Sequence, residues 1–264
     1  MTAHQPAHPL SLWQVFMGRP ETMSAGRHAE LTLRPGSFGF AAATHLIPIL
    51  FSEVPAAATS HPIVVVTEPA MGLAAVVGLE PGRNLLVRDG AWLQGRYVPA
   101  IARLYPFAPA AVLGEAGTIP LVADLAAEHL SIGGEGQSLF ADNRPTPTLA
   151  MQLKVAHMIL QETEATRDFA RALGERGVAV ARPPEQRGPM SLLPQADGVL
   201  RLDARALGRL PDAAVIEWHR RGWTAAAVLM LHAARHAAFL NALREAPVAP
   251  AKRDEDGFVP SSIV

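Results

Sequence analysis

The order of short β-type segments and long helical segments constrains this fold most. In the first half, runs that end at Pro-Gly or Asp-Gly turns predict strands at residues 29–33, 73–79 and 84–87. The β-branched run at 63–66 predicts a further strand, and shorter strand-like pieces lie at 111–113 and 119–123. Apolar spacing of three and four predicts a helix over 38–58 that is broken at Pro48, and a short helix over 98–104. In the second half, the same spacing predicts helices at 146–177, 211–222 and 224–244.

Strands that precede helices, rather than alternate with them, favour an α+β fold over a doubly wound one. We therefore expect an antiparallel sheet of short strands in the first half and three main helices in the second, within one compact domain. The expected boundaries are an N-terminal arm at 1–27, the domain at 28–246 and a disordered tail at 247–264. The tail is rich in proline and charge and has no apolar period, so folding should not require it.

Composition excludes several classes of protein. A net charge of −1 gives no basic surplus for nucleic acid, and the absence of cysteine excludes disulfides and thiolate metal sites. The first ten residues do not resemble a secretory signal, and no run of about 20 apolar residues predicts a membrane span. The glycines at 132–136 lack the lysine of a phosphate-binding loop. We expect a cytoplasmic protein without a cofactor, whose partner is a protein or peptide and whose oligomeric state is open.

The richest concentration of binding chemistry lies between residues 92 and 105. It contains two arginines, an indole and the chain's 2 tyrosines: Trp92, Arg96, Tyr97, Arg103 and Tyr105. Guanidinium groups and amphipathic rings can bind an anion or a peptide, and they can equally fasten a helix to a sheet. We expect one contiguous cluster, with the structural role favoured and the ligand-binding role kept as an alternative.

His45 and Glu53 form a second candidate, within the expected broken helix. On a regular helix the two side chains would not converge, and only a bend at Pro48 would bring them together. The favoured interpretation is that His45 caps a neighbouring backbone group, and a polar site that includes His45 is the alternative.

His232 and His236 stand four residues apart on the expected last helix, a spacing at which both imidazoles can face one metal ion. The glutamate of the zinc-protease motif is missing, and a third ligand would have to come from His157, Glu217 or His219. The favoured interpretation makes both histidines packing residues on an apolar stripe, composed with Val228, Leu229, Phe239, Leu240 and Leu243, so that no metal is bound.

Several motifs resemble those of the SapC family. They are LRPG (33–36), FGFA (38–41), THLIPI (44–49), HPIV (61–64), GLEPGRNL (78–85), GRYVP (95–99) and RLYPF (103–107). His61, Leu86 and Leu104 depart from the family pattern, where Tyr, Phe and Arg are usual. The similarity extends to about residue 245. It is to the surface-layer-associated family, and not to the peptide-transporter permease that shares the name.

The resemblance implies a link to bacterial surface biology without assigning chemistry. The family takes its name from a gene beside surface-layer genes, and members occur near outer-membrane receptors and halogenase-like proteins. No catalytic residues can be carried over. We therefore expect a non-catalytic binding or accessory protein linked to the envelope or surface layer. The alternatives are a metal-dependent enzyme acting on a peptide or amino-acid side chain, and a structural assembly subunit.

Overall fold

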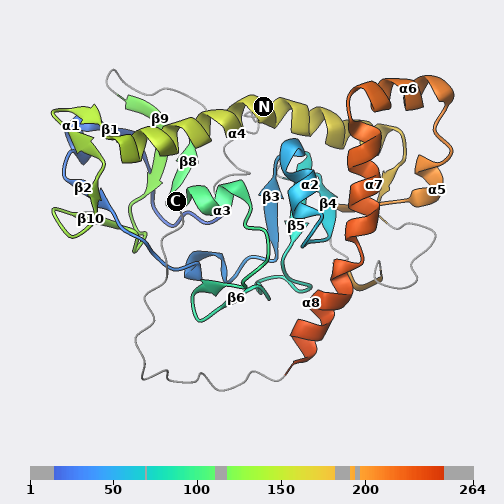
Figure 1. The fold of residues 1–264 in the computed structure, drawn as a ribbon, viewed down its shortest axis with the longest axis horizontal. Coiled ribbons are helices and arrows are strands. Elements are labelled where there is room, and N and C mark those ends of the chain that lie inside the picture. The colour runs from blue at the N-terminus through green and yellow to red at the C-terminus, as the bar shows by residue number, and fades with distance from the viewer. Residues whose placement is uncertain (1–14, 69, 111–117, 182–190, 194–196, 247–264) are drawn as a thin grey trace, which may run out of the picture.

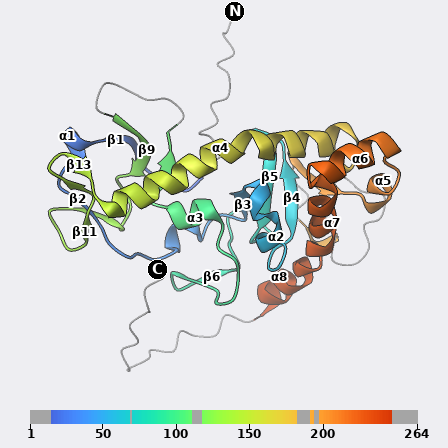
Figure 2. The same cartoon turned by 45° about the horizontal axis from the view of Figure 1, so that its top comes forward.

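A computed structural model describes residues 15–68, 70–110, 118–181, 191–193 and 197–246 of the chain. Within them, antiparallel sheets are covered by helices that come mainly from the second half of the sequence (Figure 1). The structure confirms the predicted α+β fold. The second view shows α4 lying across both the sheet that contains β9 and the sheet that contains β4 and β5 (Figure 2).

The largest sheet has five strands, and two adjacent inner strands consist entirely of buried residues. Its order is β14 (Ala179–Val180), β15 (Val199–Leu202), β4 (Ile63–Val66), β5 (Gly72–Val76) and β3 (Leu46–Ile49). Every residue of β4 and β5 is buried, as expected for strands that helices and loops cover on both faces. The strand predicted at 63–66 is confirmed, and the one predicted at 73–79 is confirmed as far as Val76, where β5 ends.

The edge strand β3 corrects the prediction of a broken helix over residues 38–58. Leu46 to Ile49 pair antiparallel with β5, and only short helical turns flank them: η2 (Gly39–Ala41), η3 (Phe51–Glu53) and α2 (Val54–Ala57). Pro48 explains the difference, because proline disfavours a helix interior and drives the preceding Ile47 to extended geometry. Its missing N–H is tolerated because β3 lies at the sheet edge.

Two smaller sheets and two hairpins complete the β structure. One sheet joins β1 (Pro20–Ser24), β9 (Thr118–Asp124) and β8 (Phe107–Pro109). The other joins β10 (Leu130–Ile132), β2 (Leu31–Leu33) and β11 (Gln137–Ser138). The hairpins are β6 (Val87–Arg88) with β7 (Ala91–Trp92), and β12 (Phe140–Ala141) with β13 (Arg144–Pro145).

The predictions for these smaller strands have mixed outcomes. The expected strands at 29–33 and 119–123 correspond to β2 and β9, whereas only Val87 of the range 84–87 is in a strand. The sequence did not predict β1, which lies within the expected N-terminal arm. The expected strand at 111–113 lies outside the described residues.

The long helix α4 (Pro147–Glu175) was predicted with its correct start. The Thr146 side chain caps it by accepting from the Leu149 N–H, and Pro147 fits the first turn, where no N–H partner is needed. Its buried residues include Leu149, Ala156, Phe169 and Leu173. The helix packs on β8 and β9 near one end and on β14 near the other.

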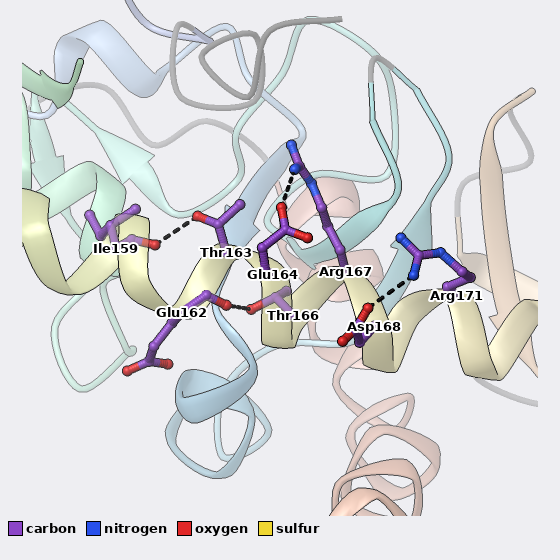
Figure 3. Close-up of polar contacts among 8 residues, drawn as sticks. All are labelled: Ile159, Glu162, Thr163, Glu164, Thr166, Arg167, Asp168 and Arg171. Atoms are coloured by element: carbon purple, nitrogen blue, oxygen red, sulfur yellow. Dashed lines mark hydrogen bonds and ion pairs between the residues drawn. The ribbon is translucent and has the colours of Figure 1, made fainter. Parts of the chain in front are cut away.

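Polar side chains on α4 are satisfied locally (Figure 3). The buried hydroxyls of Thr163 and Thr166 donate to the carbonyls of Ile159 and Glu162, at 2.7 and 2.9 Å. Thr166 also accepts from the Phe51 N–H at 2.9 Å, which ties η3 to the helix. Both buried hydroxyls are therefore hydrogen-bonded, as buried polar groups in folded proteins usually are. Two ion pairs, Arg167 with Glu164 and Arg171 with Asp168, lie on the more exposed side.

Four further helices are shorter. They are α1 (Ala25–His28), α3 (Ala100–Leu104), α5 (Ala204–Leu207) and α6 (Asp212–Arg220). The helices predicted over 98–104 and 211–222 correspond to α3 and α6.

The helix expected over 224–244 is two helices, α7 (Trp223–Ala233) and α8 (His236–Glu245). At the break, the N–H groups of Arg235, Ala237 and Ala238 each bond a carbonyl three residues back, which is 3₁₀ geometry. Neither proline nor glycine marks this position, so the break was not predicted. By length and composition alone, Trp223–Glu245 passes as a possible membrane span, and 39% of that window is buried. The prediction that no segment crosses a membrane stays a prediction.

The prediction of the apolar stripe on the last helix is wrong for its first part, α7. Val228 and Leu229 are 40% and 36% exposed, whereas the buried face consists of Trp223, Ala226, Ala227, Met230 and Ala233. Almost every residue of α7 is apolar, so its periodicity does not distinguish the two faces. On α8, Leu240 is buried as predicted.

Candidate functional site

A pocket of about 860 Å³ lies between the loop 34–38 and the segment 90–98, which begins in the turn of the hairpin β6–β7 and includes β7. We call it the loop–hairpin pocket. Its apolar lining includes Pro35, Phe38, Trp92, Leu93 and Val98, and its charged lining consists of Arg34, Arg96 and Glu128. Volume and lining fall within the range of small-molecule and peptide sites.

Two glycines let the loop pack closely, Gly90 against the hairpin turn and Gly36 against His129. Asp89 and Gly90 have φ of 50° and 75° and form the two-residue turn between β6 and β7, as the Asp-Gly pair predicted. The Gly90 carbonyl accepts from the Phe38 N–H at 2.7 Å, and a Cβ on Gly90 would lie 2.8 Å from the Ser37 Cβ. A Cβ on Gly36 would lie 2.3 Å from the His129 ring. Only glycine permits both approaches.

Hydrogen bonds to the segment before β10 hold the loop in place. The Arg34 Nε–H donates to the Glu128 carbonyl at 2.8 Å, and the Ser37 N–H and hydroxyl donate to Glu128 Oε1 at 2.9 and 2.6 Å. The bonds from Ser37 lower the pKa of Glu128. Glu128 is therefore a carboxylate engaged in fixing the loop.

The two pocket arginines keep their charge available. Among the described residues, no carboxylate forms an ion pair with Arg34 or Arg96. The Arg96 guanidinium stacks on the Phe239 ring of α8, with Cζ 3.8 Å from the ring centroid. A cation on an aromatic face retains its outward N–H donors for an anion.

His61 contacts the Trp92 ring, which lines the pocket. His61 is fully buried, and burial lowers its pKa to about 4, so the neutral imidazole donates from Nε2 to the Tyr97 carbonyl at 2.7 Å. The Trp92 ring lies edge-on to it, 6.4 Å between centroids. His61 Nδ1 and Trp92 Nε1 are both buried, and neither has a hydrogen-bond partner within the described part of the chain. This acceptor and this donor are unsatisfied polar atoms beside the ligand-accessible space.

Tyr97 and Arg103 belong to a different cluster, centred on Glu53. The Glu53 carboxylate is 7% exposed and accepts from the Tyr97 hydroxyl and the Ala100 N–H, each at 2.7 Å, and from the Leu50 N–H at 2.8 Å. The Arg103 Nη2 donates to the Tyr97 hydroxyl at 3.4 Å. Because Pro99 has no capping side chain, Glu53 supplies the acceptor for the first N–H of α3. This cluster fastens α3 to η3.

Tyr105 lies in a third setting. Its ring stacks on Phe40 at 3.8 Å, and its hydroxyl donates to Asp124 Oδ2 at 3.0 Å. Burial would raise the pKa of Asp124, but the N–H groups of Gly18, Arg19 and Ala126 hold it below its ordinary value. Asp124 thereby joins the segment before β1 to β9.

The structure divides the residues that the sequence grouped together. Trp92 and Arg96 line the loop–hairpin pocket, whereas Tyr97 and Arg103 contact Glu53, and Tyr105 contacts Phe40 and Asp124. One contiguous cluster was therefore the wrong expectation. Arg34, Phe38 and Glu128 were not predicted as pocket residues, because they come from distant segments. The available signal was the Pro-Gly pair at 35–36 and the Asp-Gly pair at 89–90.

His45 and Glu53 lie beyond opposite ends of β3 (Leu46–Ile49). Four extended residues separate them by roughly 13 Å along the strand, so the bend that would bring them together does not exist. Burial lowers the pKa of His45, and its carbonyl accepts from Val77 and Gly78.

His232 and His236 do not converge on a third ligand. His232 is exposed at the end of α7, while the His236 Nε2 bonds the Ala58 carbonyl at 3.1 Å. Across the described part of the chain, no three side chains of metal-binding type lie close enough to share an ion.

Comparison with known proteins gives one match. A family model described as SapC matches residues 23–240, which covers most of the chain, the loop–hairpin pocket and the Glu53 cluster. Neither a curated protein nor a solved structure matches significantly.

Proposed function

This chain belongs to the SapC family, and we propose that it is a non-catalytic binding or accessory protein whose ligand occupies the loop–hairpin pocket. The proposed setting is the cytoplasm, in support of the bacterial envelope or surface layer. The resemblance to surface-layer-associated proteins supports that setting, and the pocket supports the binding role.

One observation carries the binding role. Two arginines without an ion-pair partner among the described residues line a pocket that is otherwise apolar and aromatic. Arginine binds carboxylates through paired N–H donors, and aromatic rings bind apolar bodies. The complementary ligand is an anion attached to an apolar group, as in an acidic and aromatic peptide.

The pocket chemistry favours binding over catalysis. Ser37 is the only hydroxyl-bearing side chain of the lining, and it donates to Glu128 at 2.6 Å. Hydrogen bonds from Ser37 lower the pKa of that carboxylate, which makes it a weak base and leaves Ser37 a weak nucleophile. The other carboxylate and hydroxyl pairs, Tyr97 with Glu53 and Tyr105 with Asp124, join structural elements.

The binding role is tested with 8-anilinonaphthalene-1-sulfonate, a fluorescent probe that combines an aromatic body with an anion. We expect saturable binding near one site per chain, weakened at least tenfold in an Arg34→Gln, Arg96→Gln variant. Arg176→Gln, at the exposed C-cap of α4, is the matched control and should bind as the parent does. Circular dichroism confirms that each variant is folded. Equal affinity in the double variant would show that the probe binds elsewhere and would remove the basis for the proposal.

A further inference from the structure

We propose that the loop–hairpin pocket binds an extended peptide in which acidic residues precede an aromatic one, and that residues 254–259 of this chain are its resident occupant. This segment reads Asp-Glu-Asp-Gly-Phe-Val. The inference rests on the proposed function, because it takes the same pocket and names the class of its ligand. An external ligand then binds by displacing the chain's own tail.

The described chain ends beside the pocket. Ala246 follows α8, and Phe239 of α8 packs under the Arg96 guanidinium that lines the pocket. The last turn of α8 is held by Arg244, whose Nη1 lies 3.6 Å from Glu80 Oε1 in the loop leading toward β6. Both views show α8 on the same side of the molecule as β6 (Figures 1 and 2).

The tail is long enough to return to the pocket. The seven residues from Phe239 to Ala246 advance about 10 Å along the helix. The next eight residues, 247–254, span up to about 26 Å when extended. Pro247 and Pro250 oppose continuation of α8 and favour extended chain. The reach therefore exceeds the return distance by a factor of about two.

The charges and apolar groups of tail and pocket are complementary. Asp254, Glu255 and Asp256 supply three carboxylates for Arg34 and Arg96, and the one carboxylate of the pocket is already engaged by Ser37. Phe258 and Val259 follow this acidic run after one glycine, and they supply an apolar group for the aromatic part of the pocket, formed by Phe38 and Trp92. A short tether provides an effective concentration in the millimolar range, so even a weak intrinsic affinity fills the pocket most of the time.

The absence of cysteine makes the proposal directly testable in the full-length chain. Gln94→Cys places a thiol on an exposed residue of the pocket lining, and Val259→Cys places its partner on the tail. The control combines Val259→Cys with Ala213→Cys, an exposed position on α6. Equilibration in a glutathione redox buffer followed by mass spectrometry gives the effective concentration of each thiol pair. We expect at least a tenfold higher value at position 94.

Neutralising the acidic residues provides the second arm. With Asp254→Asn, Glu255→Gln and Asp256→Asn, the advantage of position 94 should fall severalfold, and the affinity for the anilinonaphthalene probe should rise about three- to tenfold. Equal disulfide formation at 94 and 213 would overturn the proposal. A disulfide between two molecules, growing with protein concentration, would overturn it in favour of a second copy. If the probe binds but the disulfide does not form selectively, the tail is not the occupant and the general binding role stands. If the disulfide forms selectively but the probe does not bind, the general binding role is refuted.

Discussion

Replacement of Glu53 by glutamine should lower the free energy of unfolding by about 3–5 kcal/mol. The carboxylate is 7% exposed and receives three hydrogen bonds, from Leu50, Tyr97 and Ala100. Glutamine has nearly the same shape, so the change isolates charge and acceptor capacity from packing.

The magnitude follows from the donors that glutamine cannot satisfy. One of its two terminal atoms is an amino group, which must face at least one of the three N–H or O–H donors. An unpaired buried donor costs about 1–3 kcal/mol, and each remaining bond loses about 1 kcal/mol when the acceptor becomes neutral. Tyr97→Phe removes one donor and leaves two bonds to the charge, so we expect a smaller loss of about 1–2 kcal/mol.

Urea unfolding followed by far-ultraviolet circular dichroism measures these losses as shifts of the midpoint at constant slope. The matched control is Glu164→Gln, which removes an exposed partner of Arg167 and should cost less than about 1 kcal/mol. A Glu53→Gln variant within about 0.5 kcal/mol of the parent would refute the conclusion that this carboxylate fastens α3 to η3.

Four further predictions concern protonation, the hairpin and metal. Burial, and then the neighbouring carboxylates, raise the pKa of both tyrosines. Absorbance at 295 nm should therefore show no tyrosinate near about pH 10.5 in folded protein, and the free energy of unfolding should fall as the pH rises above about 10. Burial lowers the pKa of His61 to about 4, so between about pH 6.5 and 4 the unfolded chain binds a proton that the folded chain lacks. The free energy of unfolding should therefore fall as the pH is lowered through this range. It should fall with a shallower slope in His61→Phe. Gly90→Ala should weaken probe binding at least threefold, while Gly82→Ala, which has the same positive φ and no atom within 4 Å of the added Cβ, should not. Protein purified without a tag should carry no stoichiometric zinc by elemental analysis, because His236 bonds Ala58 and His232 is exposed; one metal per chain that is lost in His232→Ala would restore the metal-dependent enzyme.

Local signals predicted those elements whose cause is local. The β-branched run of β4, the Asp-Gly turn of β6–β7 and the Thr-Pro start of α4 each specify their structure within a few residues. The segment around Pro48 was ambiguous because its apolar residues fit a helical period, and only pairing with β5 decides for a strand. On α7 the uniform apolar composition hides which face is buried, and packing alone decides it.

The candidate site was predictable only in the part that is contiguous in sequence. Trp92 and Arg96 were among the predicted ligand residues because they lie in one short, aromatic and basic stretch. Arg34 and Glu128 are 94 residues apart, and their contact depends on how β2 pairs with β10. Glu53 was singled out for the wrong partner, since its contacts with Tyr97 and Ala100 arise from the placement of α3.

The length of α4 affects how the molecule unfolds. Leu149, Ala156 and Ile159 belong to one apolar core, and Phe169, Ala170 and Leu173 belong to the other. A single helix of 29 residues therefore contributes to both cores, over about 44 Å. Neither core can unfold completely without exposing part of a helix that is still packed in the other core. Amide hydrogens along the whole of α4 should consequently exchange together in one cooperative event, even though the two cores lie far apart along its axis.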